Sequence, residues 1–173
     1  ASDETDSEIV RYMAGIYEML KFKRVYFSAY QKGLGDPGIP GEQDFPANGR
    51  SPADSGELFE RPDRIFMREH RLYQADFLLR KYGFTGKDIL FDAAGNLDLA
   101  RDPKQAWADA HPEFYPVNVN RAEREALFRV PGLGPAAVSL ILKLRREGRL
   151  CRPEAIGVKG VRAAKIKRYA LFE

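Results

Sequence analysis

The chain has 173 residues, of which 44% are hydrophobic and 31% charged, and its formal net charge is +3. This size and composition fit one compact domain or two small ones. Its apolar runs are shorter than the ~18 residues that cross a bilayer, and no secretory signal follows the N-terminus, so we expect a cytoplasmic protein without membrane contact. The one cysteine, Cys151, cannot close an intrachain disulfide or hold an iron–sulfur cluster alone.

The N-terminal residues predict a helix followed by a strand. Thr5 and Glu8 have the spacing of a capping box, and apolar side chains follow at intervals of three and four, so a helix is expected over residues 6–21. Residues 24–30 (RVYFSAY) are rich in β-branched and aromatic side chains without alternation, which predicts a strand covered on both faces. The edge of such a strand needs a neighbour, so we expect a partner chain, self-association or a missing domain to cover it.

Residues 31–62 predict a long loop, because they contain 6 of the 15 glycines and 5 of the 11 prolines. A loop of this length is uncommon inside a compact domain and marks a functional loop, an insertion or a boundary. Pro62 suits the first turn of a helix that runs to Gly83, since proline is favoured at the start of a helix and glycine just past its end.

Residues 63–119 as a whole are predicted to form a helical connecting region. Within it, residues 85–99 suggest a small hairpin. Pro103 begins a short helix that carries Trp107 and ends before Pro112, because a proline disfavours helical geometry in the residue before it.

The charge changes sign after residue 120. Residues 121–173 contain 13 Lys and Arg against 5 Asp and Glu, a net charge of +8, whereas the first 120 residues carry 15 basic and 20 acidic side chains, a net charge of −5. This asymmetry indicates that the basic part contacts a polyanion. A solvated basic surface without a partner is the alternative.

Residues 120–149 (NRAEREALFRVPGLGPAAVSLILKLRREGR) predict two helices joined by a glycine turn. Asn120 and Glu123 suit the N-terminal cap of the first helix. The glycines of the 132–134 turn permit positive φ angles, the leucine between them fills the space between the helices, and Pro135 starts the second helix. An ordinary helical hairpin with a glycine turn is the alternative to a binding site.

This segment resembles the helix-hairpin-helix family of DNA-binding motifs, in which an apolar-Gly-apolar-Gly signature precedes a small residue, as from Val130 to Ala137 here. The resemblance implies that bare backbone N–H groups, aided by the positive end of the second helix, bind a DNA phosphate. The implied phosphate-binding residues of the turn are Gly132, Leu133, Gly134, Ala136 and Ala137. The implied ligands of a monovalent cation are the backbone carbonyls of Phe128, Val130 and Leu133.

Residues 156–164 (IGVKGVRAA) repeat the pattern 26 positions later, although Val158 replaces the first glycine. Residues 120–173 are therefore expected to form a tandem helix-hairpin-helix unit that follows one groove of duplex DNA and makes sequence-independent, salt-sensitive contacts. No catalytic residue is predicted, since Ala136 stands where the lyase glycosylases of this superfamily carry lysine. The other predicted phosphate-binding residues are Lys143, Lys159, Gly160, Arg162 and Lys165.

A wider resemblance covers nearly the whole chain. It resembles the C-terminal region of the DNA modification or repair radical SAM proteins, and the segments that carry the resemblance are REHRLYQAD (68–76), YGF (82–84), GNL (95–97), DPK (102–104), AW (106–107) and HP (111–112). In that family a strand like residues 24–30 ends the radical SAM barrel, so residues 1–30 are expected to be a helix and strand left from a barrel. The expected fold is mostly α with a minor β component.

The resemblance implies a 4Fe-4S cluster and S-adenosylmethionine only for a full-length relative. The family holds its cluster with three cysteines in a C-x3-C-x2-C loop, and a complete barrel needs about 200 residues. We therefore expect no cofactor in this chain and no catalysis by it alone. A C-terminal fragment, one piece of a split system and a loss of the chemistry are the alternatives, and the absence of methionine at position 1 favours a fragment.

Two functions of different classes follow. The first is sequence-independent DNA binding, which would present DNA to a radical active site elsewhere in the system. The second is a protein interaction module that docks a partner chain or a barrel half without contacting DNA.

Overall fold

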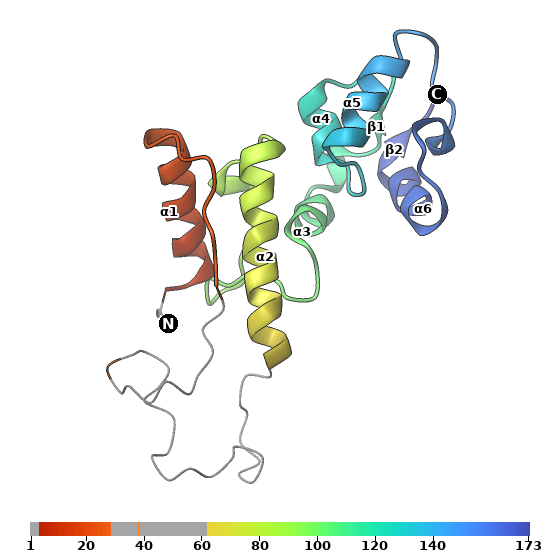
Figure 1. The fold of residues 1–173 in the computed structure, drawn as a ribbon. Coiled ribbons are helices and arrows are strands. Elements are labelled where there is room, and N and C mark those ends of the chain that lie inside the picture. Colours follow the sequence, from red (N-terminus) through yellow and green to blue (C-terminus); the bar gives the residue numbers. More distant parts are fainter. Residues whose placement is uncertain (1–3, 29–37, 39–61) are drawn as a thin grey trace. The chain divides into compact units, whose positions relative to one another are not determined.

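The computed structural model describes residues 4–28, Gly38 and 62–173. These residues are mostly helical with a minor β component, as expected from the sequence (Figure 1). They form six α-helices and a two-stranded parallel sheet. They divide into two compact units: unit 1 comprises residues 1–76 and 91–100, and unit 2 comprises residues 77–90 and 101–173. The predicted loop lies outside the described residues except for Gly38, and Pro62 already belongs to a helix. None of the described helices is both long and apolar enough to span a membrane.

Unit 1 is built on helix α1 (Asp6–Met19) and the larger part of helix α2 (Pro62–Lys81), whose residues 77–81 belong to unit 2. The predicted capping box is confirmed, because Glu8 N–H bonds the Thr5 hydroxyl at 3.3 Å and the Glu8 carboxylate accepts the Thr5 N–H at 2.9 Å. Helix α2 starts at the predicted proline and ends just before Gly83, which has a φ of +67°.

Asp6 joins three parts of unit 1. Its carboxylate is 1% exposed, and it accepts hydrogen bonds from Arg68 Nε of α2 at 2.6 Å and from the Leu97 N–H at 2.9 Å. A buried carboxylate is stable only when its lone pairs are satisfied in this way. The first residue of α1 thereby holds both α2 and the 91–100 segment.

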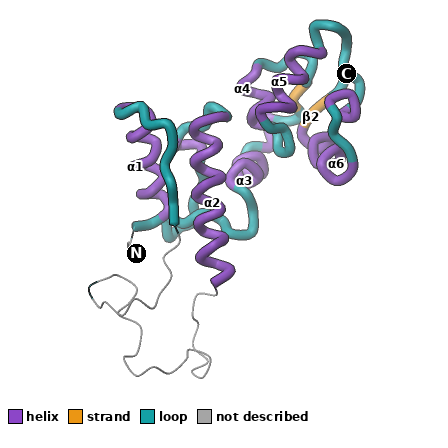
Figure 2. Tube along the Cα trace, viewed as in Figure 1, coloured by secondary structure: helices purple, strands orange, loops and turns teal. Residues whose placement is uncertain are grey.

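The predicted strand at residues 24–30 is wrong for the described residues 21–28, which form no strand pair. Figure 2 shows this segment as a loop that passes α1 and α2. Tyrosine hydroxyls take the place of a partner strand: Tyr17 accepts the Val25 N–H at 2.9 Å, and Tyr73 both accepts the Phe27 N–H at 3.0 Å and donates to the Phe27 carbonyl at 2.7 Å. The segment is therefore extended but is held by side chains of the two helices.

The hairpin suggested for residues 85–99 is also wrong. A 3-10 helix, η2 (Gly86–Asp88), occupies its start. Residues 92–96 form a turn in which Asp92 Oδ1 accepts the N–H groups of Ala94 at 2.9 Å and Asn96 at 2.8 Å. The next backbone donor, Leu97 N–H, goes to the Asp6 carboxylate, so no strand ladder forms.

Unit 2 contains the other helices: α3 (Pro103–Ala110), α4 (Arg124–Arg129), α5 (Pro135–Leu144) and α6 (Gly160–Tyr169). Two short 3-10 helices, η3 (Pro112–Phe114) and η4 (Pro153–Ile156), lie between them. Helix α3 confirms the predicted short helix, since Asp102 caps it and it ends before Pro112. Trp107 is buried among Phe84, His111, Phe114 and Tyr115, so it is a core residue.

The sheet of unit 2 pairs two strands that the sequence did not predict, β1 (Val117–Asn118) and β2 (Ala170–Leu171). Asn120 lies beside this pair and does not cap α4, whose N-cap is Glu123. The Asn120 side chain instead accepts the Leu150 N–H at 2.9 Å and donates to the Leu150 carbonyl at 3.0 Å and the Glu173 carbonyl at 2.7 Å. The Asn120 side chain therefore bonds backbone groups that are distant in the sequence and does not cap the helix that follows it.

Candidate functional site

The turn between α4 and α5 has the geometry that its glycines predict at one of two positions. Gly132 has a φ of +89°, in the region that favours glycine, whereas Gly134 has a φ of −106° and extended geometry. Between them, Leu133 is 1% exposed and belongs to the unit 2 core. Pro135 is the first residue of α5, as expected. The turn is therefore fixed by one left-handed glycine and one buried leucine.

Four backbone N–H groups at this turn have no hydrogen-bond partner among the described residues. Among the described residues, the N–H groups of Gly132, Gly134, Ala136 and Ala137 donate no hydrogen bond, whereas Leu133 N–H bonds the Val130 carbonyl at 3.1 Å and Val138 N–H bonds the Gly134 carbonyl at 2.9 Å. The free groups lie at the N-terminus of a ten-residue helix, which carries a partial positive charge. Such an arrangement suits an anion.

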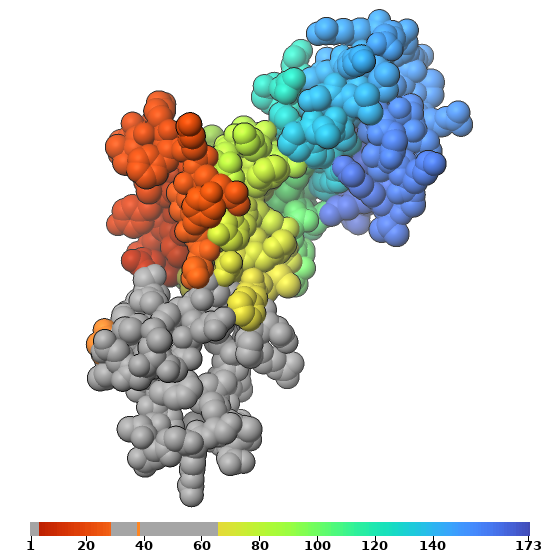
Figure 3. Space-filling view, in the orientation of Figure 1, coloured from red at the N-terminus to blue at the C-terminus, as the bar shows by residue number. Residues whose placement is uncertain are grey.

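The turn packs directly against α6. A Cβ atom at Gly132 would lie 2.9 Å from Ile166 Cγ1, so only glycine fits there. Arg162 Nε, from the first turn of α6, donates to the Gly132 carbonyl at 2.9 Å. In the space-filling view, the chain from α5 to α6 is drawn in neighbouring cyan and blue atoms (Figure 3).

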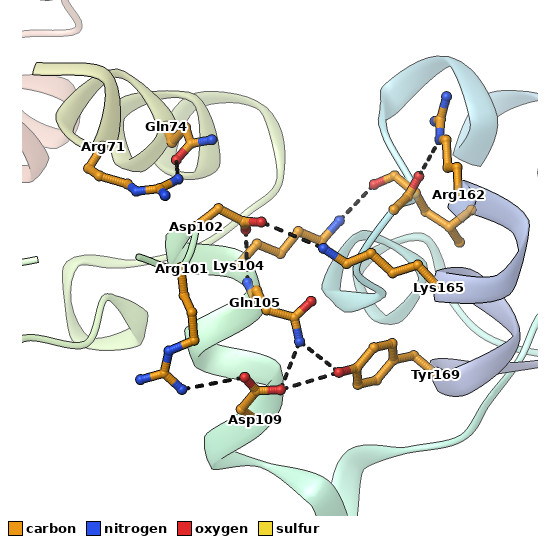
Figure 4. A network of polar contacts seen from close by, with 12 residues as sticks. Arg71, Gln74, Arg101, Asp102, Lys104, Gln105, Asp109, Arg162, Lys165 and Tyr169 are labelled. Atoms are coloured by element: carbon orange, nitrogen blue, oxygen red, sulfur yellow. Dashed lines mark hydrogen bonds and ion pairs between the residues drawn. The ribbon is translucent and has the colours of Figure 1, made fainter. Parts of the chain in front are cut away.

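A lysine from α3 reaches the middle of the same turn. Lys104 Nζ donates to the Leu133 carbonyl at 2.7 Å, the dashed line that leaves Lys104 in Figure 4. The same nitrogen lies 4.5 Å from the centroid of the Tyr82 ring. The nearby Asp102 carboxylate is shared: it caps α3 and lies 3.7 Å from Lys165 Nζ of α6. These contacts connect α3, the turn and α6.

The environment of Lys104 disfavours its charged form. The side chain is 8% exposed, and burial lowers its pKa from 10.5 to about 7. The carboxylate of Asp102 opposes this shift, and the positive charges of Lys165, Arg129 and Arg162 add to it. Burial likewise raises the pKa of Tyr82, whose hydroxyl would lie 3.4 Å from a Cβ atom at Gly134.

Lys104 gives a testable pH dependence of stability. Its folded-state pKa is below the unfolded value, so between about pH 7 and 10.5 the unfolded chain binds more protons and stability rises with pH. From about pH 7 to pH 9.5, the free energy of unfolding should gain about 3 kcal/mol relative to Lys104→Met. Urea denaturation followed by Trp107 fluorescence measures this gain. Replacing the exposed Lys87 by Met should leave the pH dependence of the wild type in place, and an unchanged dependence in Lys104→Met would refute the assignment.

The second predicted turn differs from the first. Its leading arm is η4, a four-residue 3-10 helix bounded by Pro153 and by Gly157, which has a φ of +72°. Val158, at the position of the first glycine, is buried in the core at 4% exposure. Gly160 begins α6 with a φ of +58°, and Lys159 is its N-cap. The sequence predicts an α-helix before this turn, as in the first hairpin. The structure instead has the short 3-10 helix η4 and the buried Val158 before α6.

The structure brings together most of the predicted phosphate-binding residues but separates one. The turn residues, Arg162 and Lys165 lie around the start of α5 and α6, connected by the contacts above. Lys143 is nine residues beyond Gly134 on α5, about 13 Å along the helix axis. It cannot contact the phosphate that the turn would bind.

Two of the three carbonyls predicted to bind a monovalent cation already accept a hydrogen bond in the structure. The Leu133 carbonyl accepts Lys104 Nζ at 2.7 Å, and the Val130 carbonyl accepts the Leu133 N–H at 3.1 Å. The Lys104 ammonium therefore already supplies a positive charge to one of the proposed ligands. The cation site stays a prediction.

Sequence reasoning missed Lys104, Asp102 and Tyr82 as parts of this site. Lys104 follows Pro103 in a short helix and has the sequence context of an ordinary exposed lysine. No local pattern reports that α3 packs against a turn almost thirty residues away, because that contact exists only in the folded unit.

Metal ligands are few in the described part of the chain. No group of three or more His, Cys, Asp and Glu side chains there is arranged to hold a metal ion, and the Cys151 thiol is free and exposed. One cysteine does not provide the three thiolates of the 4Fe-4S cluster that the resemblance implies, so the residues present do not fit that group. Comparisons with family models, curated proteins and solved structures found no significant match to this chain.

Proposed function

We propose that the chain binds the phosphate backbone of duplex DNA without sequence preference, through a tandem helix-hairpin-helix unit in residues 120–173. The observation that carries this proposal is the set of four backbone N–H groups without a hydrogen-bond partner at the glycine turn. Glycine has no side chain, so a phosphate oxygen can come within hydrogen-bond distance of the backbone N–H groups of a glycine turn. Such contacts position a protein on DNA but read no sequence.

The charge around the turn supports an anionic partner. Residues 121–173 carry a net charge of +8. Lys159 and Arg162 are exposed at the start of α6, and Arg162 is already held against the turn through its Nε. Each phosphate that such side chains neutralise releases counterions, so affinity falls steeply as salt rises.

The wider role that we propose is the DNA-binding part of a DNA modification or repair radical SAM system in the cytoplasm. In this proposal the chain holds the duplex. The cluster, whose three cysteine ligands this sequence does not contain, and S-adenosylmethionine belong to another part of the system. The chain then contributes binding and position, and no catalytic step is assigned to its residues.

Gly134 is the position at which the phosphate contact is best tested. A Cβ atom there meets only the Tyr82 hydroxyl at 3.4 Å, and the φ of −106° suits alanine, so Gly134→Ala should fold normally. The added methyl group lies beside the free N–H groups and should weaken duplex binding about tenfold, since each tenfold change is about 1.4 kcal/mol. Fluorescence anisotropy with a labelled duplex measures the affinity across a series of salt concentrations.

Gly148→Ala is the matched control for this experiment, because a Cβ atom there meets nothing within 4 Å. It should bind duplex DNA as the wild type does. Binding that ignores both salt concentration and the Gly134 substitution would rule out phosphate recognition by the turn.

A protein partner is the second candidate function, and unit 1 supplies the observation that favours it. Several large apolar side chains after the middle of α1 are exposed, among them Met19 at 78% and Tyr26 at 74%. Exposed apolar groups that form one contiguous surface patch are typical of interaction surfaces. If the wild type fails to bind duplex DNA at low salt, docking of a partner on this segment is the function that remains.

A further inference from the structure

Lys104 is a buried cation whose closest partner is a backbone carbonyl. Its Nζ lies 2.7 Å from the Leu133 carbonyl oxygen, and the side chain is 8% exposed. Burying an ammonium group is costly unless it is paired, yet Asp102, the nearest acidic group among its neighbours, also pairs with Lys165 at 3.7 Å. The fold thus places the Lys104 amine next to the glycine turn, on the side to which the Leu133 carbonyl points (Figure 4).

The bond to the Leu133 carbonyl sets the direction of the next amide. The Leu133–Gly134 peptide is trans, since the one cis peptide in the described residues is Tyr115–Pro116. In a planar trans peptide the C=O and the following N–H point in opposite directions. Because Lys104 holds the carbonyl towards α3, the Gly134 N–H must point away from Lys104.

The peptide groups before the Leu133 carbonyl are also held by hydrogen bonds. Arg162 Nε holds the Gly132 carbonyl at 2.9 Å, and the Leu133 N–H is used internally by the Val130 carbonyl. Two cationic side chains from different helices therefore bind successive carbonyls of the turn. The amide that follows the Leu133 carbonyl, the Gly134 N–H, is left without a partner among the described residues, whereas the amide that follows the Gly132 carbonyl is the Leu133 N–H used within the turn.

We infer that Lys104 is a positioning residue for DNA binding: it orients the Gly134 N–H towards the phosphate without itself touching the nucleic acid. When its amine is protonated, it also adds a positive charge on the opposite side of the Leu133–Gly134 peptide. This inference rests on the proposed function. The groups that face Lys104 are Asp102, Tyr82, Arg129, Arg162 and Lys165. A charge in this low-dielectric setting is screened by salt less than a surface charge is.

The test compares Lys104→Met, Lys104→Arg and the exposed-lysine control Lys87→Met in duplex binding at about pH 6, where the Lys104 amine is protonated. Lys104→Met should weaken binding about tenfold at every salt concentration. The slope of log affinity against log salt should not change, because a residue that touches no phosphate releases no counterion. Lys104→Arg, which keeps a charged donor, should recover most of the affinity, and Lys87→Met should differ from the wild type by less than about twofold.

Each other outcome is decisive. Unchanged affinity in Lys104→Met overturns the inference, and so does a slope reduced by about 0.9, which would mean direct phosphate contact. If the wild type binds no duplex, the proposed function and this inference both fail. If Gly134→Ala weakens binding but Lys104→Met does not, the proposed function is supported and the inference about Lys104 is wrong.

A measurement on the wild type keeps the inference testable if Lys104→Met does not fold. In NMR titrations with duplex DNA, the amide signal of Gly134 should shift, and the side-chain signals of Lys104 should shift much less than those of Lys159. A Gly134 amide that does not respond to duplex DNA would overturn the inference.

Discussion

Replacing Gly132 by alanine is expected to destabilise unit 2 by about 3 kcal/mol. The φ of +89° costs an L-residue about 1 kcal/mol of backbone strain. The added Cβ atom would lie 2.9 Å from Ile166 Cγ1, and Ile166 is completely buried, so it has no free space to move into. Overpacking a rigid core site adds about 1–3 kcal/mol to the strain.

Urea denaturation followed by Trp107 fluorescence measures this effect, because Trp107 belongs to unit 2. Gly157→Ala is the matched control: it shares a positive φ of +72°, but a Cβ atom there meets nothing within 4 Å. It should cost about 1 kcal/mol, the strain alone. Equal losses in the two variants would show that the turn does not pack against α6 in solution.

This result determines how DNA binding should be tested. A combined change of both glycines would mix a folding defect with a binding defect. Gly134→Ala separates them, since its φ is ordinary and its nearest neighbour is a hydroxyl at 3.4 Å.

Replacing Asp6 by alanine is expected to destabilise unit 1 by about 3 kcal/mol. The change removes the buried acceptor of the Leu97 N–H and the partner of Arg68 in one step. The Leu97 N–H would be left buried without a partner, which accounts for much of the loss. Arg68 is 38% exposed in its side chain and can be hydrated, so its contribution is smaller.

Amide hydrogen exchange in α1 and in residues 62–76 of α2 reports this loss separately from unit 2. Asp92→Ala is the matched control, because Asp92 also accepts two backbone N–H groups but is exposed. Its removal should cost about 1 kcal/mol, since water replaces the lost bonds. An equal loss of protection in both variants would contradict the role of Asp6 as a buried junction.

Local signals in the sequence were sufficient for the helices that begin or end with strong caps. The Thr5–Glu8 capping box, the Pro62 and Pro103 starts and the Pro135 start all mark real helix ends. These signals succeed because the cap residue and the backbone groups that it satisfies are within four positions of one another.

The predictions of other elements were wrong where a group distant in the sequence formed the hydrogen bond that a local partner was expected to form. The composition of residues 24–30 is that of a strand, but the hydroxyls of Tyr17 and Tyr73 take the backbone bonds of residues 25 and 27. Asn120 has the spacing of an N-cap, but it bonds Leu150 and the C-terminal residue. The real strands are two residues long, too short for any periodicity.

The sequence by itself determined the mostly helical fold, the Gly-Leu-Gly turn and the basic charge that surrounds it, because these depend on residues adjacent in the chain. Only the tertiary structure decided that Gly132 must be glycine on both φ and steric grounds, that Lys143 is remote from the turn, and that Lys104 and Arg162 hold its carbonyls. The physical reason is that burial and hydrogen-bond direction arise when α3, the turn and α6 pack together. A buried lysine and an exposed one have the same letter in the sequence, but only packing gives the first its lowered pKa and its fixed partner.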